Sequence, residues 1–292
     1  MKTKLKLSLL AALLSVQASA FSQDTNFWIF LCFGQSNMES GSRMEEMDRT
    51  VDKRFQVLAD FDAPNRGWKK GNWYNAVPPL TARGNGLSLV DYFGRTMVAN
   101  LPEKIRIGVV KVSVSGTKIE LWDQDSYQAY LATADAWKVN LAKQLGGNPY
   151  QYLVDLAKIA QKDGVIKGIL IHQGESNVDD NDWPKKVKKV HDQLMKDLDL
   201  KPESVTLLAG EVVNADHQGE KAAFNEILKK LPETLPNSYV ISSAGLPCNP
   251  DHLHFTAAGY REFGKRYGEK MLSVMGYKIK PPEPQPATPP GH

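Results

Sequence analysis

Two short segments near opposite ends of the chain carry residue types that could form a nucleophile and its base. Ser36 lies in "FGQSNM", directly after the apolar run 27–33. Asp251 and His254 lie three residues apart in "NPDHLHF", just before a helical pattern that starts near Thr256. An aspartate at this spacing can accept a hydrogen bond from Nδ1 of the histidine, which leaves Nε2 to take the proton of a serine hydroxyl. The segments therefore predict a Ser-His-Asp hydrolase.

Each segment also has an ordinary structural interpretation. Gly-Gln-Ser-Asn is a common helix start, in which a serine or asparagine caps free backbone N–H groups, and Asp251 could cap the last helix in the same way. His252 is a rival base, but we expect its position directly beside Asp251 to point it away from that carboxylate. Single short motifs have a high false-positive rate, so the choice between a catalytic and a structural role depends on the rest of the chain.

Two further segments offer groups that could stabilise an oxyanion. Gly116, in "SGTKIELW", lies in a predicted turn where its backbone N–H can approach a substrate without interference from a Cβ atom. Gln173, in "HQGESN", offers a side-chain amide donor, and we expect Glu175 to hold Gln173 or a loop, with a surface carboxylate as the alternative. A single glycine or glutamine is more often a turn residue, but several such groups at one edge favour catalysis.

The elements that must position these residues alternate along the chain. Short apolar runs, mostly rich in Val and Ile, predict buried parallel strands over 27–33, 105–114, 165–171, 204–209 and 238–242. Helical patterns cover about 87–100, 125–143, 150–163, 184–198, 219–231 and 256–275. Strands separated by helices predict an α/β fold with one doubly wound parallel sheet of five strands. Ligands bind beyond the carboxyl ends of such strands, where Ser36, Gly116 and Gln173 all lie.

Residues 39–86 show little periodicity and carry Trp68, Trp73, Tyr74 and two consecutive prolines. A loop of this length inside a compact domain is usually functional. We therefore expect this segment to lie over the strand ends.

Taken together, "FGQSNM", "SGTKIELW", "HQGESN" and "DHLHF" resemble the signature blocks of the SGNH hydrolase superfamily. "GQSNM" with "HQGES" is specific to the branch that holds sialate O-acetylesterases and the acetyl-xylan esterases of carbohydrate esterase family 6. The resemblance covers about residues 27–275 and implies a three-layer α/β/α, flavodoxin-like fold. It implies Ser36 as nucleophile, His254 as base and Asp251 as the carboxylate that orients the base. It also implies an oxyanion hole from the N–H groups of Ser36 and Gly116 and a third donor.

The chain departs from the wider superfamily at the third donor, where Gln173 stands in place of an asparagine. Glutamine is one methylene longer but carries the same amide donors, so the role can transfer. The branch implies removal of acetyl groups from a carbohydrate, with acetylated xylan preferred over sialic acid. Trp68 and Trp73 are candidates to stack on sugar rings, although aromatic loop residues are as often local core.

Two other functions remain open besides a sialate O-acetylesterase. A non-catalytic glycan-binding module can share this fold, but it has no reason to retain a base behind the serine. A lipase or thioesterase would need a broad apolar acyl pocket, whereas "GTKIELWDQD" beside the predicted site is polar.

The first twenty residues, "MKTKLKLSLLAALLSVQASA", have the pattern of a secretory signal peptide that is cleaved after Ala20. Three lysines precede a short apolar run, and small residues stand in an A-x-A arrangement. We therefore predict a signal at 1–20, an esterase domain at 21–278 and a secreted or periplasmic protein. Residues 279–292 hold six prolines and are predicted to be an extended tail or the stub of a linker.

The composition is that of an ordinary globular protein, with 42% hydrophobic and 24% charged residues among 292. The net charge of +3 comes from the lysines of the leader, without which 33 basic residues face 33 acidic ones. This balance gives no reason to expect nucleic acid or an anionic membrane as a partner. We expect a monomer that spans no membrane and binds an acetylated oligo- or polysaccharide.

We expect the protein to need no cofactor or metal. We also expect its two cysteines to be free thiols. His172, Glu175 and His191 are the one cluster with ligand types, but they lack metal-site spacing. Cys32 lies inside an apolar run, where a thiol packs as a small hydrophobe, so we predict that it is buried and not bridged to Cys248.

Overall fold

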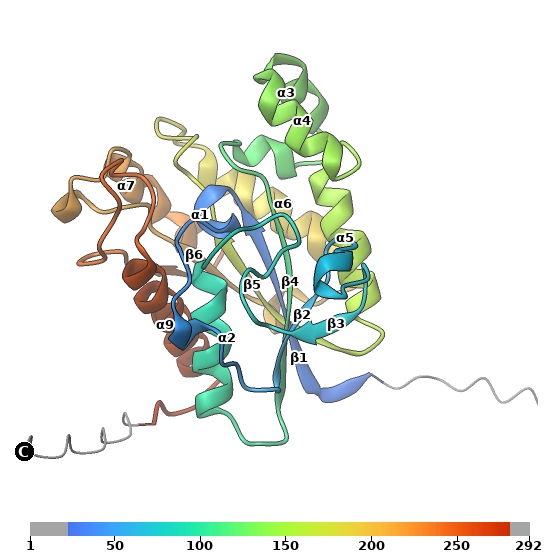
Figure 1. Cartoon of the computed structure of the whole chain (residues 1–292). Coiled ribbons are helices and arrows are strands. Elements are labelled where there is room, and N and C mark those ends of the chain that lie inside the picture. Colours follow the sequence, from blue (N-terminus) through green and yellow to red (C-terminus); the bar gives the residue numbers. More distant parts are fainter. Residues whose placement is uncertain (1–22, 281–292) are drawn as a thin grey trace, which may run out of the picture.

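A seven-stranded sheet runs through the centre of the computed structural model, which describes residues 23–280 (Figure 1). The predicted signal at 1–20 and most of the predicted tail lie outside the described residues. The strands are β1 (Asp24–Gly34), β2 (Phe55–Leu58), β3 (Trp73–Asn75), β4 (Arg106–Ser113), β5 (Gly164–His172), β6 (Thr206–Gly210) and β7 (Ser238–Ile241).

The strands follow the order β3-β2-β4-β1-β5-β6-β7, with every neighbouring pair parallel except β2 and β3. The predicted strands correspond to β1, β4, β5, β6 and β7. The prediction of five strands was wrong by two, because the segment 39–86 supplies β2 and β3 at one edge of the sheet. Strands of four and three residues are too short for a period-2 pattern to reveal them.

Helices cover both faces of the sheet, which confirms the predicted three-layer α/β/α architecture (Figure 1). Ile29, Leu31 and Phe33 of β1 point to one core and Phe30 and Cys32 to the other, as alternation along a strand requires. The helices are α1 (Ser36–Glu39), α2 (Leu89–Asn100), α3 (Tyr127–Thr133), α4 (Ala136–Gln144), α5 (Pro149–Ala160), α6 (Trp183–Asp197), α7 (Asn225–Leu228), α8 (Leu231–Thr234) and α9 (Ala257–Val274). Helices α2 and α9 pack on the second core, and α5 and α6 pack on the first.

Two predicted helices are broken in the structure. The pattern at 125–143 forms α3 and α4, separated by an extended backbone at Ala134. The pattern at 219–231 forms a short turn followed by α7 and α8, since Pro232 lacks the N–H needed inside a helix and stands in the first turn of α8. The α3–α4 segment lies beyond the strand ends (Figure 1), whereas Ile227, Leu228 and Leu231 pack into the first core.

Cys32 is fully buried in the second core, as predicted, and burial strongly raises the pKa of its thiol. Cys248 is half-buried, and its Sγ lies 3.6 Å from the carbonyl oxygen of His217. Across residues 23–280, the helices are too short or too polar for any of them to cross a bilayer.

Candidate active site

Ser36 stands at the first position of α1, directly beyond the carboxyl end of the central strand β1. The chain can turn there because Gly34 lies against β5: a Cβ atom at this position would come within 2.0 Å of the His172 carbonyl oxygen. Gln35 then anchors the turn by donating its N–H to the same carbonyl at 3.0 Å. The serine is half-buried, with its hydroxyl facing the loop that precedes α9.

That loop brings His254 and Asp251 to Ser36. Nε2 of His254 lies 2.9 Å from the Ser36 hydroxyl, and its Nδ1 lies 2.8 Å from Oδ2 of Asp251. The other Asp251 oxygen accepts the backbone N–H groups of Leu253 and His254, both at 3.0 Å. Burial opposes ionisation of this carboxyl, but the hydrogen bonds from the backbone and side chain of His254 outweigh it and lower the pKa of Asp251 below its ordinary value.

His252 points away from this group. Its backbone has a positive φ of 51°, and its Nδ1 faces the carbonyl oxygen of His217 at 3.1 Å. The structure therefore gives one histidine a contact with the serine and directs the other to a neighbouring loop.

The backbone N–H groups of Ser36 and Gly116 are available as donors. In the described part of the chain neither donates a hydrogen bond, since Ser36 opens a helix and Gly116 lies in the turn after β4. Gly116 has a φ of +68°, which favours glycine, and a Cβ atom there would lie 2.4 Å from the indole ring of Trp137. Trp137 was not among the predicted site residues.

Gln173 differs from its prediction, because its amide hydrogens are already engaged. Its Nε2 donates to Asn177 Oδ1 at 2.7 Å and to the Thr117 carbonyl oxygen at 3.1 Å, and the side chain is 1% exposed. Its Oε1 accepts the indole N–H of Trp183, which fixes the orientation of the amide. The residue therefore ties the end of β5 to the loop that carries Gly116, and the structure leaves it no amide hydrogen for a third oxyanion contact.

Glu175 is buried and holds Asn37 rather than Gln173. Its Oε1 accepts a hydrogen bond from Asn37 Nδ2 at 2.7 Å and lies 3.5 Å from Nδ1 of His172. Burial lowers the pKa of His172, whose Nε2 contacts the Glu211 carbonyl oxygen at 3.0 Å. Glu175 is thus a positioning group behind the serine and not a surface carboxylate.

Asn37 joins the serine turn to the histidine loop. The residue belongs to the motif "FGQSNM", but the sequence alone does not indicate this role. The side chain is fully buried, and its Nδ2 also donates to the Leu253 carbonyl oxygen at 2.9 Å. Its Oδ1 accepts the Tyr260 hydroxyl at 2.7 Å and the Phe255 N–H at 3.3 Å. Contacts on both sides of His254 therefore depend on one amide.

We expect Asn37→Ala to lower the free energy of unfolding by about 1–3 kcal/mol, because Glu175 and Tyr260 would keep buried polar atoms without partners. Urea denaturation followed by circular dichroism measures this change. The matched control is Asn85→Ala, since Asn85 is exposed and the change should stay within about 0.5 kcal/mol. Equal effects of the two substitutions would show that the network adds nothing to stability.

Neither predicted sugar-stacking tryptophan has a free ring face at the serine. Trp68 is 6% exposed; its ring stacks with Tyr74, at 5.4 Å between ring centroids, and the Arg66 guanidinium lies 3.6 Å from its centroid. Trp73 packs edge-on against Phe27 near the amino end of β1, at the opposite edge of the sheet from Ser36. Both are local core, the alternative interpretation of aromatic residues in such a segment.

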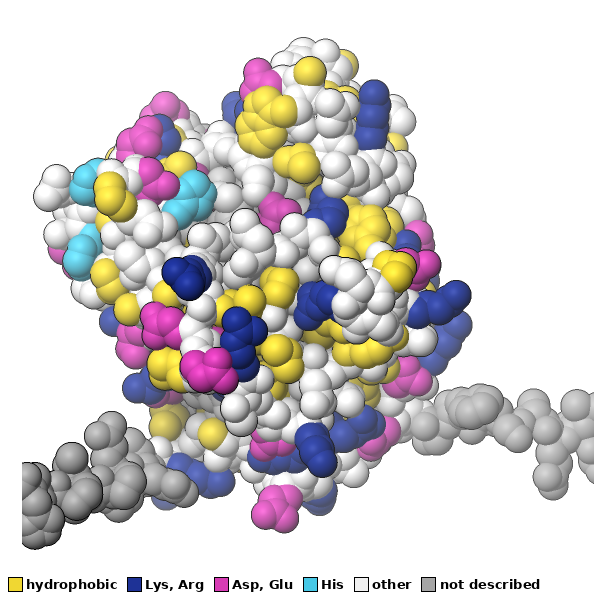
Figure 2. All heavy atoms as spheres, viewed as in Figure 1, with side chains coloured by type: hydrophobic (Ala, Val, Ile, Leu, Met, Phe, Trp, Pro, Cys, Tyr) yellow, Lys and Arg dark blue, Asp and Glu magenta, His cyan; other side chains and the backbone are white. Residues whose placement is uncertain are grey.

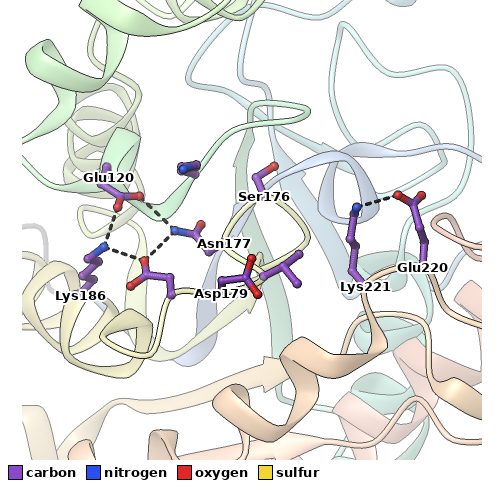
Figure 3. A pocket seen from close by; sticks show the side chains of 10 residues that line it. Glu120, Ser176, Asn177, Asp179, Lys186, Glu220 and Lys221 are labelled. Carbon is purple, nitrogen blue, oxygen red and sulfur yellow. Dashed lines mark hydrogen bonds and ion pairs between the residues drawn. The ribbon is translucent and has the colours of Figure 1, made fainter.

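A polar pocket of about 580 Å³ adjoins this edge of the sheet (Figure 3). Lys118 and Ser176, which line it, lie two residues after Gly116 and one after Glu175. Most of its charges are paired: Lys186 lies 2.7 Å from Glu120 and 2.6 Å from Asp180, and Lys221 lies 2.6 Å from Glu220. Among the described residues that line it, Val178 is the one with a wholly aliphatic side chain.

A doubly wound α/β/α sheet with a hydrogen-bonded Ser, His and Asp at its carboxyl edge is the architecture of an SGNH-like ester hydrolase. The chain belongs to the carbohydrate esterase, sialic acid-specific acetylesterase family, whose model matches residues 26–273. It is therefore a carbohydrate acetylesterase, a carboxylic ester hydrolase.

Three solved structures share this fold. A protein from Arabidopsis thaliana is 21% identical with a TM-score of 0.65, over 86% of this chain and 99% of its own. The protein NanS is 15% identical with a TM-score of 0.61, over 87% and 99%. A carbohydrate acetylesterase from Xanthomonas citri is 20% identical with a TM-score of 0.58, over 84% of this chain and 56% of its own. At these identities the similarity establishes the fold and nothing finer.

Proposed function

We propose that the protein is a secreted serine esterase that removes O-acetyl groups from carbohydrate through an acyl-enzyme, with acetylated xylan or a similar polysaccharide as substrate. The observation that carries this proposal is the hydrogen-bonded chain from Ser36 through His254 to Asp251. Export is inferred from the leader at 1–20.

In the first half of the reaction the Ser36 hydroxyl attacks the ester carbonyl while Nε2 of His254 takes its proton. Asp251, held ionised by its hydrogen bonds, stabilises the imidazolium that forms. The developing oxyanion faces the free N–H groups of Ser36 and Gly116, as such donors must be aimed before charge develops. Collapse of the intermediate breaks the bond to the sugar oxygen, which leaves with the proton of His254.

In the second half a water molecule attacks the acetyl-serine, again with His254 as the base. As the second tetrahedral intermediate collapses, the bond to the Ser36 oxygen breaks, His254 returns the proton to that oxygen, and acetate is released. Gln173 and Glu175 act as positioning residues in this scheme, since the first holds the Gly116 loop and the second holds Asn37.

The polar pocket at this edge of the sheet favours a sugar over a long acyl chain. Its lining offers carboxylates, amines, an amide and a hydroxyl, which match the hydroxyl groups of a saccharide. A pocket for a long acyl chain would need a continuous apolar wall, because each buried methylene contributes about 0.8 kcal/mol. The same polarity argues against the lipase or thioesterase alternative.

Sialate O-acetylesterase activity is the second candidate, and the description of the matched family favours it. A sialic acid carries a carboxylate, for which a bidentate arginine is the usual partner. No arginine is among the residues that line the pocket in the described part of the chain, and two of its lysines are paired with carboxylates. This charge pattern is the reason for preferring a neutral sugar.

Acetate release should be fastest on acetylated xylan, slower on O-acetylated sialic acid, and much faster on 4-nitrophenyl acetate than on 4-nitrophenyl octanoate. The physical reason is a pocket with few apolar groups to bind added methylenes. Enzymatic quantification of acetate and absorbance of nitrophenolate measure the four rates. Faster turnover of the octanoate would support a lipase, and a preference for sialic acid would overturn the choice of xylan.

A further inference from the structure

One large aromatic side chain lies in solvent near the candidate site. Among residues 23–280, the large hydrophobic side chains classed as exposed are Met47, Trp137 and Ile279, and Trp137 is 50% exposed. Exposing half of an indole forgoes much of the stabilisation that its burial would give. This tryptophan is not required by the core, so its position calls for a functional explanation.

Trp137 is carried by a part of the fold that contributes little to the core. Helix α3 has no buried residue and α4 has one, Ala142. Figure 1 shows the two helices projecting from the body beyond the strand ends. Figure 2 shows that the surface is hollowed between this projection and the lobe that contains α7. Tyr130 fixes the projection to the site, because its hydroxyl accepts the N–H of Lys118 at 3.3 Å.

The indole lies against the turn that carries the proposed oxyanion donor. A Cβ atom on Gly116 would lie 2.4 Å from the edge of the Trp137 ring, so the two residues are in direct contact. A carbonyl oxygen bound at the Gly116 N–H would therefore lie close to the turn that the indole contacts. Lys138 Nζ lies 5.3 Å from the centroid of the same ring and is bonded to Asp135 at 2.8 Å.

A second pocket, of about 370 Å³, is lined in part by residues that flank Trp137 in the chain. Its lining includes Lys118, Tyr130, Thr133, Asp135, Lys138 and Ser176. A sugar ring presents apolar C–H groups on its faces and hydroxyl groups around its rim. An exposed indole beside a set of donors and acceptors matches both parts of that chemistry.

We propose that Trp137 is a specificity-determining residue that stacks on the sugar ring bearing the acetyl group, with the rim hydroxyls directed toward the pocket of 370 Å³. This inference rests on the proposed esterase function of the same site. It assigns the recognition of the sugar to the α3–α4 projection, and not to Trp68 and Trp73.

The test compares a sugar ester with an ester that has no ring. Trp137→Ala should lower kcat/KM for partially acetylated xylo-oligosaccharides by at least about tenfold, mainly through KM, because an aromatic contact with the sugar is lost. The loss on ethyl acetate should be less than about threefold. Trp137→Phe should recover part of the sugar activity, and Lys143→Ala, an exposed change on the same helix, should alter neither substrate.

Calorimetry with the same oligosaccharides separates this inference from the proposed function. In a Ser36→Ala background, adding Trp137→Ala should weaken binding by at least about tenfold. A wild-type protein that releases no acetate from any ester would contradict the esterase proposal, while the binding comparison would still decide the role of Trp137. Two outcomes would overturn the inference. In the first, Trp137→Ala lowers kcat/KM equally for the sugar ester and for ethyl acetate, which would mean that the indole only supports the Gly116 turn. In the second, Trp137→Ala leaves the affinity for the oligosaccharides unchanged.

Discussion

Ser36→Ala is expected to lower the rate of acetate release by at least about 10³-fold and to leave a folded protein. Within residues 23–280 the hydroxyl is the hydrogen-bonding partner of His254 Nε2, so its removal leaves the base without a nucleophile to activate. The fold should persist, since among the described residues the Ser36 hydroxyl bonds to His254 alone and Gln35 anchors the turn through its backbone. Initial rates on 4-nitrophenyl acetate, with circular dichroism as a check of folding, measure the effect.

Ser40→Ala is the matched control for this substitution. Ser40 lies four residues further along the same segment, and its hydroxyl accepts the backbone N–H of Asn85 at 3.3 Å. Its loss should leave most of the activity, because that contact is remote from the base. More than about a tenth of the wild-type rate in Ser36→Ala would remove the serine from the mechanism.

The positions of the candidate catalytic residues could be predicted because topology fixes them. In a parallel sheet the carboxyl ends of neighbouring strands meet at one edge, so residues that follow β1, β4 and β5 are brought together whatever the loops do. The spacing of Asp251 and His254 is local, and a three-residue turn sets their geometry. Both arguments need only the sequence and the element types.

The partners of buried amides could not be predicted in this way. Gln173 has the right type and the right strand end for an oxyanion donor, but its hydrogens are taken by Thr117 and by Asn177. Those contacts depend on how the loop after β4 packs on the segment after β5, which no periodicity records. The role of Asn37 could not be predicted for the same reason. The residue stands in the motif "FGQSNM", but its hydrogen-bond partners lie in a loop more than 200 residues away.

The tryptophans illustrate the same limit. Trp68 and Trp73 lie in a segment without clear periodicity, yet Trp68 is buried against the Arg66 guanidinium and Trp73 is partly buried against Phe27. Trp137 lies in a predicted helix, and the signal that could have found it is a tryptophan in "DAWKVNLAK", a segment with no apolar stripe for a core. The exposed fraction of the side chain separates Trp137 from Trp68, and that fraction is set by tertiary packing, which the sequence pattern does not record.

His254→Ala should reduce turnover about as strongly as Ser36→Ala, by at least about 10³-fold, whereas His252→Ala should keep most of the activity. The two histidines are chemically identical and two residues apart, so only their geometry separates them. His254 lies between Ser36 and Asp251 at 2.9 and 2.8 Å, whereas His252 faces the carbonyl oxygen of His217.

Alanine at 254 also preserves the loop, because the backbone N–H that binds Asp251 Oδ1 remains. A loss in His254→Ala therefore reports on the missing base and not on a displaced loop, and the melting temperatures of both variants verify this. Parallel kcat measurements on 4-nitrophenyl acetate give the ranking. If His252→Ala is the inactive variant and His254→Ala the active one, the base has been assigned to the wrong histidine, and the contact between Nε2 and the serine hydroxyl has no part in catalysis.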